Sequence, residues 1–116
     1  MTEPTRPAEA VDITEGKRRV EGGALLLDVR NPDEWHAGHV DGSTWIPMGE
    51  VTDRQGELPT DREIVVACAV GGRSARVAEA LNAWGYNAVN LAGGLKAWVE
   101  ADLPIVTDDG DGGTVL

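Results

Sequence analysis

The chain has 116 residues, of which 41% are hydrophobic and 26% are charged. These proportions are typical of one folded domain with a single core, and they exclude a wholly disordered chain and a pair of ordinary domains. Ten basic against twenty acidic side chains leave a net charge of −10, which repels nucleic-acid phosphates and anionic membrane surfaces, so neither is expected as a partner.

The chain contains a single cysteine, Cys68. A lone cysteine excludes an intrachain disulfide and a multi-cysteine metal site. Residues 1–10 lack the cationic and apolar stretches of a signal peptide, and no apolar run approaches the roughly 20 residues of a membrane helix. We therefore expect a cytoplasmic protein.

The first elements follow a polar, proline-bearing segment, 1–10, which we expect to be a flexible lead-in. Residues 11–13 predict a short strand, and Thr14 is the predicted N-cap of a helix that reaches Glu21 and ends at two glycines. Residues 24–29, with the sequence ALLLDV, predict a strand that is buried on both faces. A short helix at 33–37, a strand at 44–46 and a second short helix at 48–54 are expected next.

Residues 63–68, with the sequence EIVVAC, predict the second strong strand, which runs into a Gly-Gly loop. A helix is expected over 73–84, with Val77, Leu81 and Trp84 on one face. A third strand at 87–91 and a last helix after two further glycines complete the domain, and 107–116 is expected to be a flexible acidic tail.

This alternation of strands and helices predicts an α/β fold: a central, mostly parallel β-sheet flanked by helices on both faces. Ligand sites in such sheets lie beyond the carboxyl ends of the strands. Residues 28–30 and 68–74 both fall at such ends.

The segment from Cys68 to Ser74, with the sequence CAVGGRS, is the most informative part of the chain. A thiol leaves a buried strand, two glycines turn the chain, and a helix begins. Backbone N–H groups and the positive end of the helix dipole then converge on one point, where they stabilise an anion. We expect this cradle for the Cys68 sulfur to be built from Ala69, Val70, Gly71, Gly72, Arg73 and Ser74.

A thiol in this cradle is expected to have a lowered pKa, because the thiolate accepts those hydrogen bonds and is attracted by Arg73. Attack of the thiolate on a sulfane sulfur would give a persulfide, whose outer sulfur is anionic and needs the same cradle. The planar guanidinium of Arg73 suits the oxyanion part of a donor such as thiosulfate.

Two other interpretations of Cys68 stay open. A free cysteine at the end of an apolar strand is commonly a small buried hydrophobe, but such a cysteine needs neither two glycines nor a cation after it. Tyrosine phosphatases also place a cysteine and an arginine around an amide-lined loop, with one residue more between them than the four between Cys68 and Arg73. The smaller ring suits one sulfur atom better than a phosphoryl group, so a small phosphatase or oxyanion reductase is the weaker alternative.

With these residues in place, the chain resembles the single-domain rhodaneses over about Val11 to Ile105. The family pattern appears as Leu27-Asp28-Val29-Arg30, Glu34, Gly38-His39-Val40, Gly42-Ser43, Ile46-Pro47, the Cys68 loop, and Gly93-Gly94 with Trp98. The resemblance implies a rhodanese-like domain at 11–106 and a thiosulfate sulfurtransferase-type activity through a persulfide, without cofactor or metal. Its donor would be thiosulfate or a persulfide, and its acceptor a thiol, cyanide or a carrier protein.

By the same resemblance, Cys68 is the catalytic nucleophile, Arg73 the cation that binds substrate, and Ser74 a helix cap or hydroxyl donor. Many active members carry a basic residue directly after the cysteine, where this chain has Ala69, and this weakens the case for thiosulfate. The alternative is a non-catalytic rhodanese-like module that binds a protein partner, which the retention of Cys68 and Arg73 disfavours.

Several other polar or aromatic residues are candidates for smaller roles. Asp28, Arg30 and Trp45 are candidates for the pocket rim, although we expect the first two mainly to hold neighbouring loops. The pair His36 and His39 lacks the further ligands that a metal site needs. The acidic stretch at 108–111 lacks the ligand spacing of a calcium loop.

Overall fold

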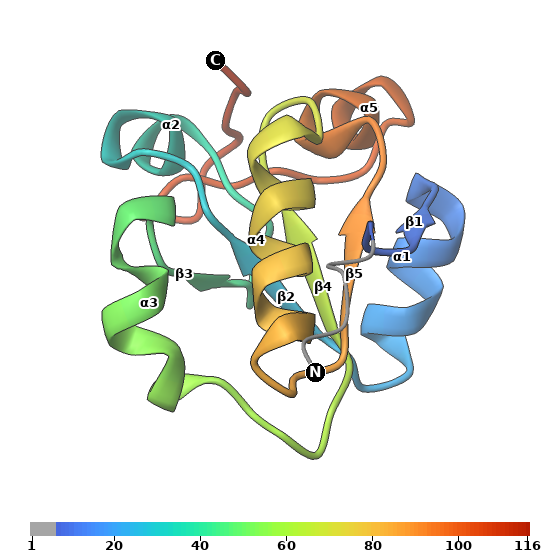
Figure 1. The fold of residues 1–116 in the computed structure, drawn as a ribbon. Coiled ribbons are helices and arrows are strands. Elements are labelled where there is room, and N and C mark those ends of the chain that lie inside the picture. The colour runs from blue at the N-terminus through green and yellow to red at the C-terminus, as the bar shows by residue number, and fades with distance from the viewer. Residues whose placement is uncertain (1–6) are drawn as a thin grey trace, which may run out of the picture.

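The computed structural model describes residues 7–116. They form a five-stranded sheet with the strand order β1-β5-β4-β2-β3, in which every neighbouring pair is parallel (Figure 1). The strands are β1 (Ala10–Val11), β2 (Leu25–Asp28), β3 (Thr44–Trp45), β4 (Ile64–Ala67) and β5 (Ala88–Leu91). The predicted parallel α/β fold is confirmed.

Helices cover both faces of the sheet (Figure 1). They are α1 (Ile13–Glu21), α2 (Pro32–Ala37), α3 (Val51–Arg54), α4 (Gly72–Ala83) and α5 (Gly94–Glu100), with short 3-10 helices at Met48–Glu50 and Gln55–Glu57. One core cluster joins α3 and α4 to the sheet, and the other joins α1 and α5 to its opposite face. Within residues 7–116, no helix is long and apolar enough to cross a bilayer.

The central strand β4 shows how the sheet positions the cysteine. All four of its residues are buried, which is why its sequence is an unbroken apolar run. Val66 belongs to the core under α4, and Val65 and Ala67 belong to the core under α1 and α5. Because successive side chains alternate between faces, Cys68, directly after the strand, lies on the α4 side.

Two local predictions are wrong. The N-cap of α1 is Asp12, not Thr14, because the strand before it ends at Val11 and the Asp12 carboxylate accepts a hydrogen bond from the Glu15 amide at 2.8 Å. Trp84 does not share the buried face of α4, because the helix ends at Ala83 and the Trp84 residue is 41% exposed.

The two ends of the predicted domain make contacts that composition does not indicate. Residues 1–6 of the predicted lead-in lie outside the described residues, and the Glu9 carbonyl already accepts a hydrogen bond from the Asn90 amide of β5. After α5, Val106 forms antiparallel bridges with His39 and Gly112. The Thr114 amide then donates to the carbonyl of Ala37 at 2.9 Å, so this segment returns to α2. The flexibility of 107–116 stays a prediction.

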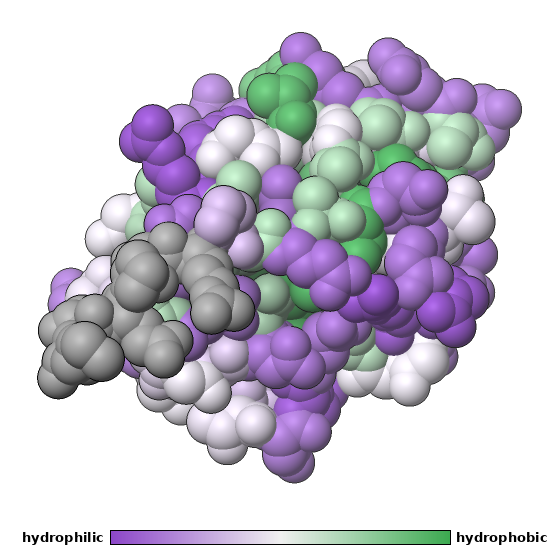
Figure 2. All heavy atoms as spheres, turned by 45° about the vertical axis from the view of Figure 1, so that its right-hand side comes forward, coloured by the Kyte–Doolittle hydropathy of each residue, from purple (hydrophilic) through white to green (hydrophobic). Residues whose placement is uncertain are grey.

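The face turned forward in Figure 2 is covered mainly by hydrophilic residues, with smaller groups of hydrophobic ones between them. Between α1 and the end of α5 lies a hollow lined by apolar Ile13 and Leu103 and by charged Lys17, Arg18 and Glu21.

Candidate active site

The Cys68 sulfur lies where β4 ends and α4 begins. Gly71, the N-cap of α4, has a φ of 101°, a left-handed conformation that glycine adopts without strain. This turn directs the Gly71 amide to Sγ of Cys68 at 3.1 Å. The Ser74 amide lies 3.4 Å and the Ser74 hydroxyl 3.2 Å from the same sulfur. Two amides and one hydroxyl, all from the segment 68–74, therefore lie within hydrogen-bond distance of Sγ.

Cys68 is 1% exposed, yet its environment is not that of an inert core cysteine. Burial raises the pKa of the Cys68 thiol, but hydrogen bonds from the Ser74 hydroxyl and from the amides of Ser74, Gly71 and Val70 together outweigh it and hold that pKa below its ordinary value. The loop thus favours the thiolate, which is the nucleophilic form.

The other residues of the predicted cradle have different surroundings. Ala69 is 7% exposed and its carbonyl accepts a hydrogen bond from the Lys96 amide at 3.0 Å. Val70 is 62% exposed and lies on the side of the loop that faces solvent. Gly72 lies in the first turn of α4, directly before Arg73. The loop therefore has one face toward the sulfur, one toward α5 and one toward solvent.

Arg73 is held by a carboxylate of another element. Its Nη1 and Nη2 donate to the two carboxylate oxygens of Glu34 in α2, at 2.7 and 2.9 Å. Arg73 holds the pKa of Glu34 below its ordinary value. Glu34 in turn raises the pKa of Arg73, and the Cys68 thiolate raises it further. The positive charge expected to face the donor is therefore partly neutralised. Sequence reasoning placed Glu34 in the family pattern but did not assign it this partner.

The two glycines after β5 support the cysteine loop from behind. The Leu95 amide donates to the carbonyl of Cys68 at 2.8 Å, next to the bond from Lys96 to Ala69. Gly94 has a φ of 63°, and a Cβ at this position would lie 2.5 Å from the Cys68 carbonyl oxygen. The close approach of α5 to the loop therefore requires glycine at 94.

Asp28 and Arg30 lie in the interior and do not form a rim. They are 1% and 0% exposed and form an ion pair at 2.8 Å, and Arg30 also donates to the Gly38 carbonyl at 2.7 Å. They are buried because Arg30 turns back from the strand end to tie β2 to the segment after α2. Trp45 is half-buried, donates through Nε1 to the Arg30 carbonyl at 2.9 Å and stacks on Trp35.

The two histidines are engaged with other groups. His39 stacks on Trp35 at 3.7 Å between ring centroids, and its Nδ1 lies 2.9 Å from the Trp35 carbonyl. His36 lies 2.7 Å from the Asp108 carboxylate. Among residues 7–116, no group of three or more side chains suitable for a metal ion is present.

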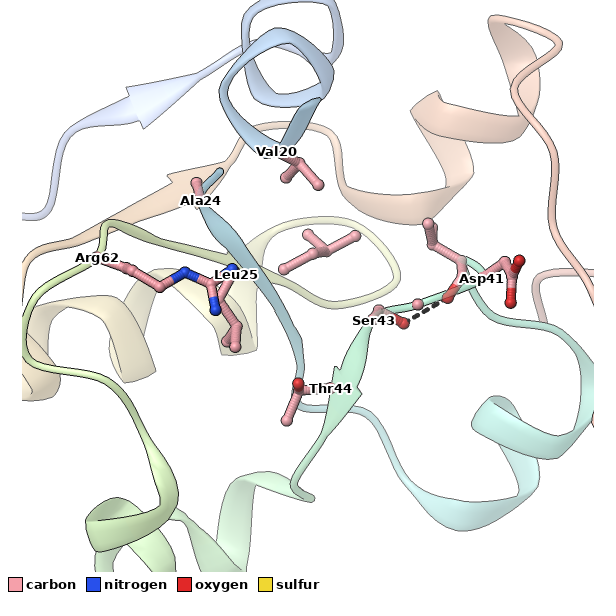
Figure 3. A pocket seen from close by; sticks show the side chains of 10 residues that line it. Val20, Ala24, Leu25, Asp41, Ser43, Thr44 and Arg62 are labelled. Atoms are coloured by element: carbon pink, nitrogen blue, oxygen red, sulfur yellow. Dashed lines mark hydrogen bonds between the residues drawn. The ribbon is translucent and has the colours of Figure 1, made fainter. Parts of the chain in front are cut away.

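A cavity of about 250 Å³ lies beside the amino end of β2 (Figure 3). It is bordered by Leu25 and Thr44, the first residues of β2 and β3, and by Asp41 and Arg62. Because Cys68 follows the carboxyl end of a parallel strand, this cavity is not part of its surroundings.

Known proteins are similar to this chain in sequence. The family model described as a rhodanese-like domain matches residues 12–101. A sulfurtransferase of Allochromatium vinosum is 39% identical over 87 residues, covering 74% of this chain and 81% of the relative. The probable adenylyltransferase/sulfurtransferase MoeZ of Mycobacterium tuberculosis is 37% identical over 84% of this chain, which spans only 25% of that larger protein.

A solved structure supports the same relationship. The crystal structure of a rhodanese-related protein from Thermoplasma volcanium matches with a TM-score of 0.81 and 31% identity, covering 86% of this chain and 99% of that one. The fold is thus that of a known group of proteins.

Proposed function

Because the chain belongs to the rhodanese-like family, we propose that it is a sulfurtransferase that carries sulfane sulfur as a persulfide on Cys68. The observation that carries this proposal is the convergence of the Gly71 amide and of the Ser74 amide and hydroxyl on Sγ. Donors so placed favour negative charge on Sγ, both in the thiolate that attacks the donor and in the thiolate that is released when the acceptor takes the outer sulfur.

The proposed reaction has two balanced halves. The Cys68 thiolate attacks the outer sulfur of the donor, a new Sγ–S bond forms, and the donor's sulfur–sulfur bond breaks. Its electron pair leaves with sulfite, from thiosulfate, or with a thiolate, from a persulfide. In the second half an acceptor attacks the outer sulfur, and the electron pair of the Sγ–S bond returns to Sγ as thiolate. No cofactor takes part.

The charges near Cys68 favour a persulfide over thiosulfate as donor. Glu34 occupies two N–H groups of Arg73, Ala69 adds no charge, and the net charge of the chain is −10. The site therefore offers little positive charge to attract a thiosulfate dianion. A persulfide carries less negative charge and depends less on such attraction. The proposed acceptor is a thiol, cyanide or the thiol of a carrier protein.

Phosphatase activity fits this site less well. Cys68 is 1% exposed, and a tetrahedral phosphoryl group needs more room beside it than one sulfur atom. A non-catalytic binding module would have no need of a thiol whose pKa is lowered.

The direct experiment is intact mass spectrometry after incubation with a polysulfide, a low-molecular-weight persulfide or thiosulfate. We expect a gain of one sulfur atom that cyanide removes, and no such gain in Cys68→Ser. Absence of the gain with every donor, in a folded protein whose Cys68 is alkylated normally, would point to the binding module. Hydrolysis of an aryl phosphate without any gain would point to a phosphatase.

A further inference from the structure

A buried ring of hydrogen bonds links the Cys68 sulfur to Asn90, a residue to which the sequence pattern assigns no role. Asn90 lies in β5, is 8% exposed and pairs in register with Val66 of β4. Its Nδ2 donates to the Gly71 carbonyl at 3.2 Å, and its Oδ1 lies 2.6 Å from the Ser74 hydroxyl. Since the Gly71 amide and the Ser74 hydroxyl both contact Sγ, the ring closes at the sulfur.

The Gly71 carbonyl fixes which way the Asn90 amide group faces. A carbonyl oxygen only accepts hydrogen bonds, so the nitrogen of Asn90 must face Gly71 and its oxygen must face Ser74. That oxygen also only accepts. The single hydrogen of the Ser74 hydroxyl is therefore drawn toward Asn90, at the shorter of its two contacts.

This arrangement treats the two protonation states of Cys68 differently. The neutral thiol donates its S–H to Ser74 Oγ, Ser74 donates to Asn90, and all three groups are satisfied. The thiolate needs the same hydroxyl hydrogen that Asn90 holds. If Ser74 turns to the sulfur, Oδ1 of Asn90 becomes a buried acceptor without a donor, which is unfavourable.

We propose that Asn90 is a positioning residue that acts through Ser74: it accepts the hydroxyl hydrogen of Ser74 while Cys68 is neutral, and this hydrogen turns to the sulfur when the sulfur is charged. Asn90 thereby opposes formation of the free thiolate, although the loop as a whole favours it.

The same switch has a consequence for sulfur transfer, which rests on the proposed function. When Cys68 carries a persulfide, the negative charge moves to the outer sulfur and Sγ becomes a neutral, two-bonded atom. The Ser74 hydroxyl is then free to return to Asn90. Asn90 therefore stabilises the persulfide relative to the free thiolate.

The other charged groups around the loop are the same in all variants considered below. They are Arg73 of α4, Glu34 of α2, the buried pair formed by Asp28 at the end of β2 and Arg30 just after it, and Lys96 in the first turn of α5. A change in the titration of Cys68 on replacement of Asn90 is therefore not due to a change in net charge.

The test is the pH dependence of Cys68 alkylation by iodoacetamide in wild type, Asn90→Leu, Ser74→Ala and the double variant. Cys68 is the only cysteine, so the rate reports on this thiol alone, and no sulfur donor is involved. We expect Asn90→Leu to lower the pKa of Cys68, so that alkylation well below that pKa is about threefold faster or more. In the Ser74→Ala background, Asn90→Leu should have no effect on the pKa.

An equal effect of Asn90→Leu in both backgrounds would overturn the proposal, because Asn90 would then act through the Gly71 carbonyl and the loop backbone. An unchanged or raised pKa in the single variant would overturn it as well. Circular dichroism verifies folding, and Asn90→Ala carries the same prediction if the leucine variant does not fold. Because alkylation needs no persulfide, a failure here is distinct from a failure of the proposed sulfur transfer.

Discussion

The side chains of Glu34 and Arg73 decide what charge a donor meets at Cys68. The Arg73 side chain is 35% exposed and that of Glu34 is 12% exposed, so the pair is only partly screened by water. Arg73 remains a cation, but both of its terminal nitrogens donate hydrogen bonds to the Glu34 carboxylate of α2. Donor preference is therefore a property of a contact between two elements.

Glu34→Gln should raise kcat/KM for thiosulfate by about three- to tenfold at low ionic strength, because it releases one negative charge from Arg73. The value for a persulfide of low charge should change less. The glutamine oxygen can still accept the hydrogen bond from the Asn31 amide that Glu34 accepts at 3.0 Å.

Glu100→Gln is the matched control, since it removes the same charge from an exposed position at the end of α5. A fall in thiosulfate turnover in Glu34→Gln, with Glu100→Gln unchanged, would show that Glu34 orients Arg73 for the donor and does not compete with it.

The site residues that could be predicted are those whose relationship is local. Cys68, Gly71 and Ser74 lie within seven residues of one turn, so strand, glycine and helix start suffice to bring them together. Glu34 lies 39 residues before Arg73, and only the folded arrangement of α2 and α4 brings the two side chains into contact. The sequence does carry a signal for Asn90, which is a polar residue in the otherwise apolar strand AVNL.

Among the elements, α5 determines the shape of the cysteine loop, because its first amides hold the carbonyls of Cys68 and Ala69. Gly94→Ala should lower the free energy of unfolding by about 2 kcal/mol or more, since its Cβ would meet backbone atoms at a positive φ. It should also slow alkylation of Cys68 at fixed pH. Urea unfolding and iodoacetamide kinetics measure both effects.

Gly49→Ala is the control for this glycine, because a Cβ there meets no atom within 4 Å. If Gly94→Ala matched Gly49→Ala in both stability and alkylation rate, α5 would not support the loop.

Helix α1 is attached to the sheet by an ion-pair network. The Arg19 side chain contacts Glu15 in its own helix at 2.7 Å and Glu63 before β4 at 2.9 Å. Hydrogen bonds from Arg18 and Arg19 lower the pKa of Glu15 from 4.5 to about 2. Because the pKa of Glu15 is lower in the folded protein, its ion pairs stabilise the fold fully when the pH is above the ordinary pKa. This stabilisation disappears as the pH falls through the lowered pKa.

The melting temperature of Glu15→Gln should therefore be below that of wild type at neutral pH, and the difference should vanish as the pH falls from 4.5 to about 2. Thermal unfolding followed by circular dichroism over this range measures it, with Glu100→Gln as the charge control. A difference that is constant down to the lowest pH would contradict the network.

The predicted helices and strands match the structure where the hydrophobic periodicity and the residues typical of element ends agree. They differ from the structure where two such signals compete for the same end. Asp12 and Thr14 are both good N-cap residues, and the end of β1 at Val11 decides between them. Trp84 fits the apolar stripe of α4 by spacing, but the helix ends one residue earlier.

Across the whole molecule, the buried pair Asp28–Arg30 joins the central sheet to the segment after α2. Both residues are almost fully buried, and Arg30 satisfies two backbone carbonyls, those of Glu34 and Gly38. Arg30→Met should lower the free energy of unfolding by about 3–5 kcal/mol, because it leaves the Asp28 charge buried without its partner.

The double variant Asp28→Ala with Arg30→Met should be more stable than Arg30→Met alone, since no unpaired charge remains. Equilibrium unfolding in urea compares the three proteins. A loss below 1 kcal/mol in Arg30→Met would mean that water or a neighbouring group replaces the arginine.

The overall architecture could be predicted because the alternation of apolar strands and helices leaves few arrangements of a parallel sheet. The path of the chain after α5 could not. The bridges of Val106 with His39 and Gly112, and the bond from Thr114 to Ala37, depend on the position of α2, and composition carries no signal for them.

The most direct test of the account is a single-turnover experiment with a donor whose sulfane sulfur is isotopically labelled. The purified protein is loaded, freed of donor and mixed with cyanide. We predict that the labelled sulfur is first found on Cys68 and then, in equal amount, in thiocyanate, and that Cys68→Ser neither takes up nor releases it. Label that reaches thiocyanate without ever residing on Cys68 would contradict the account.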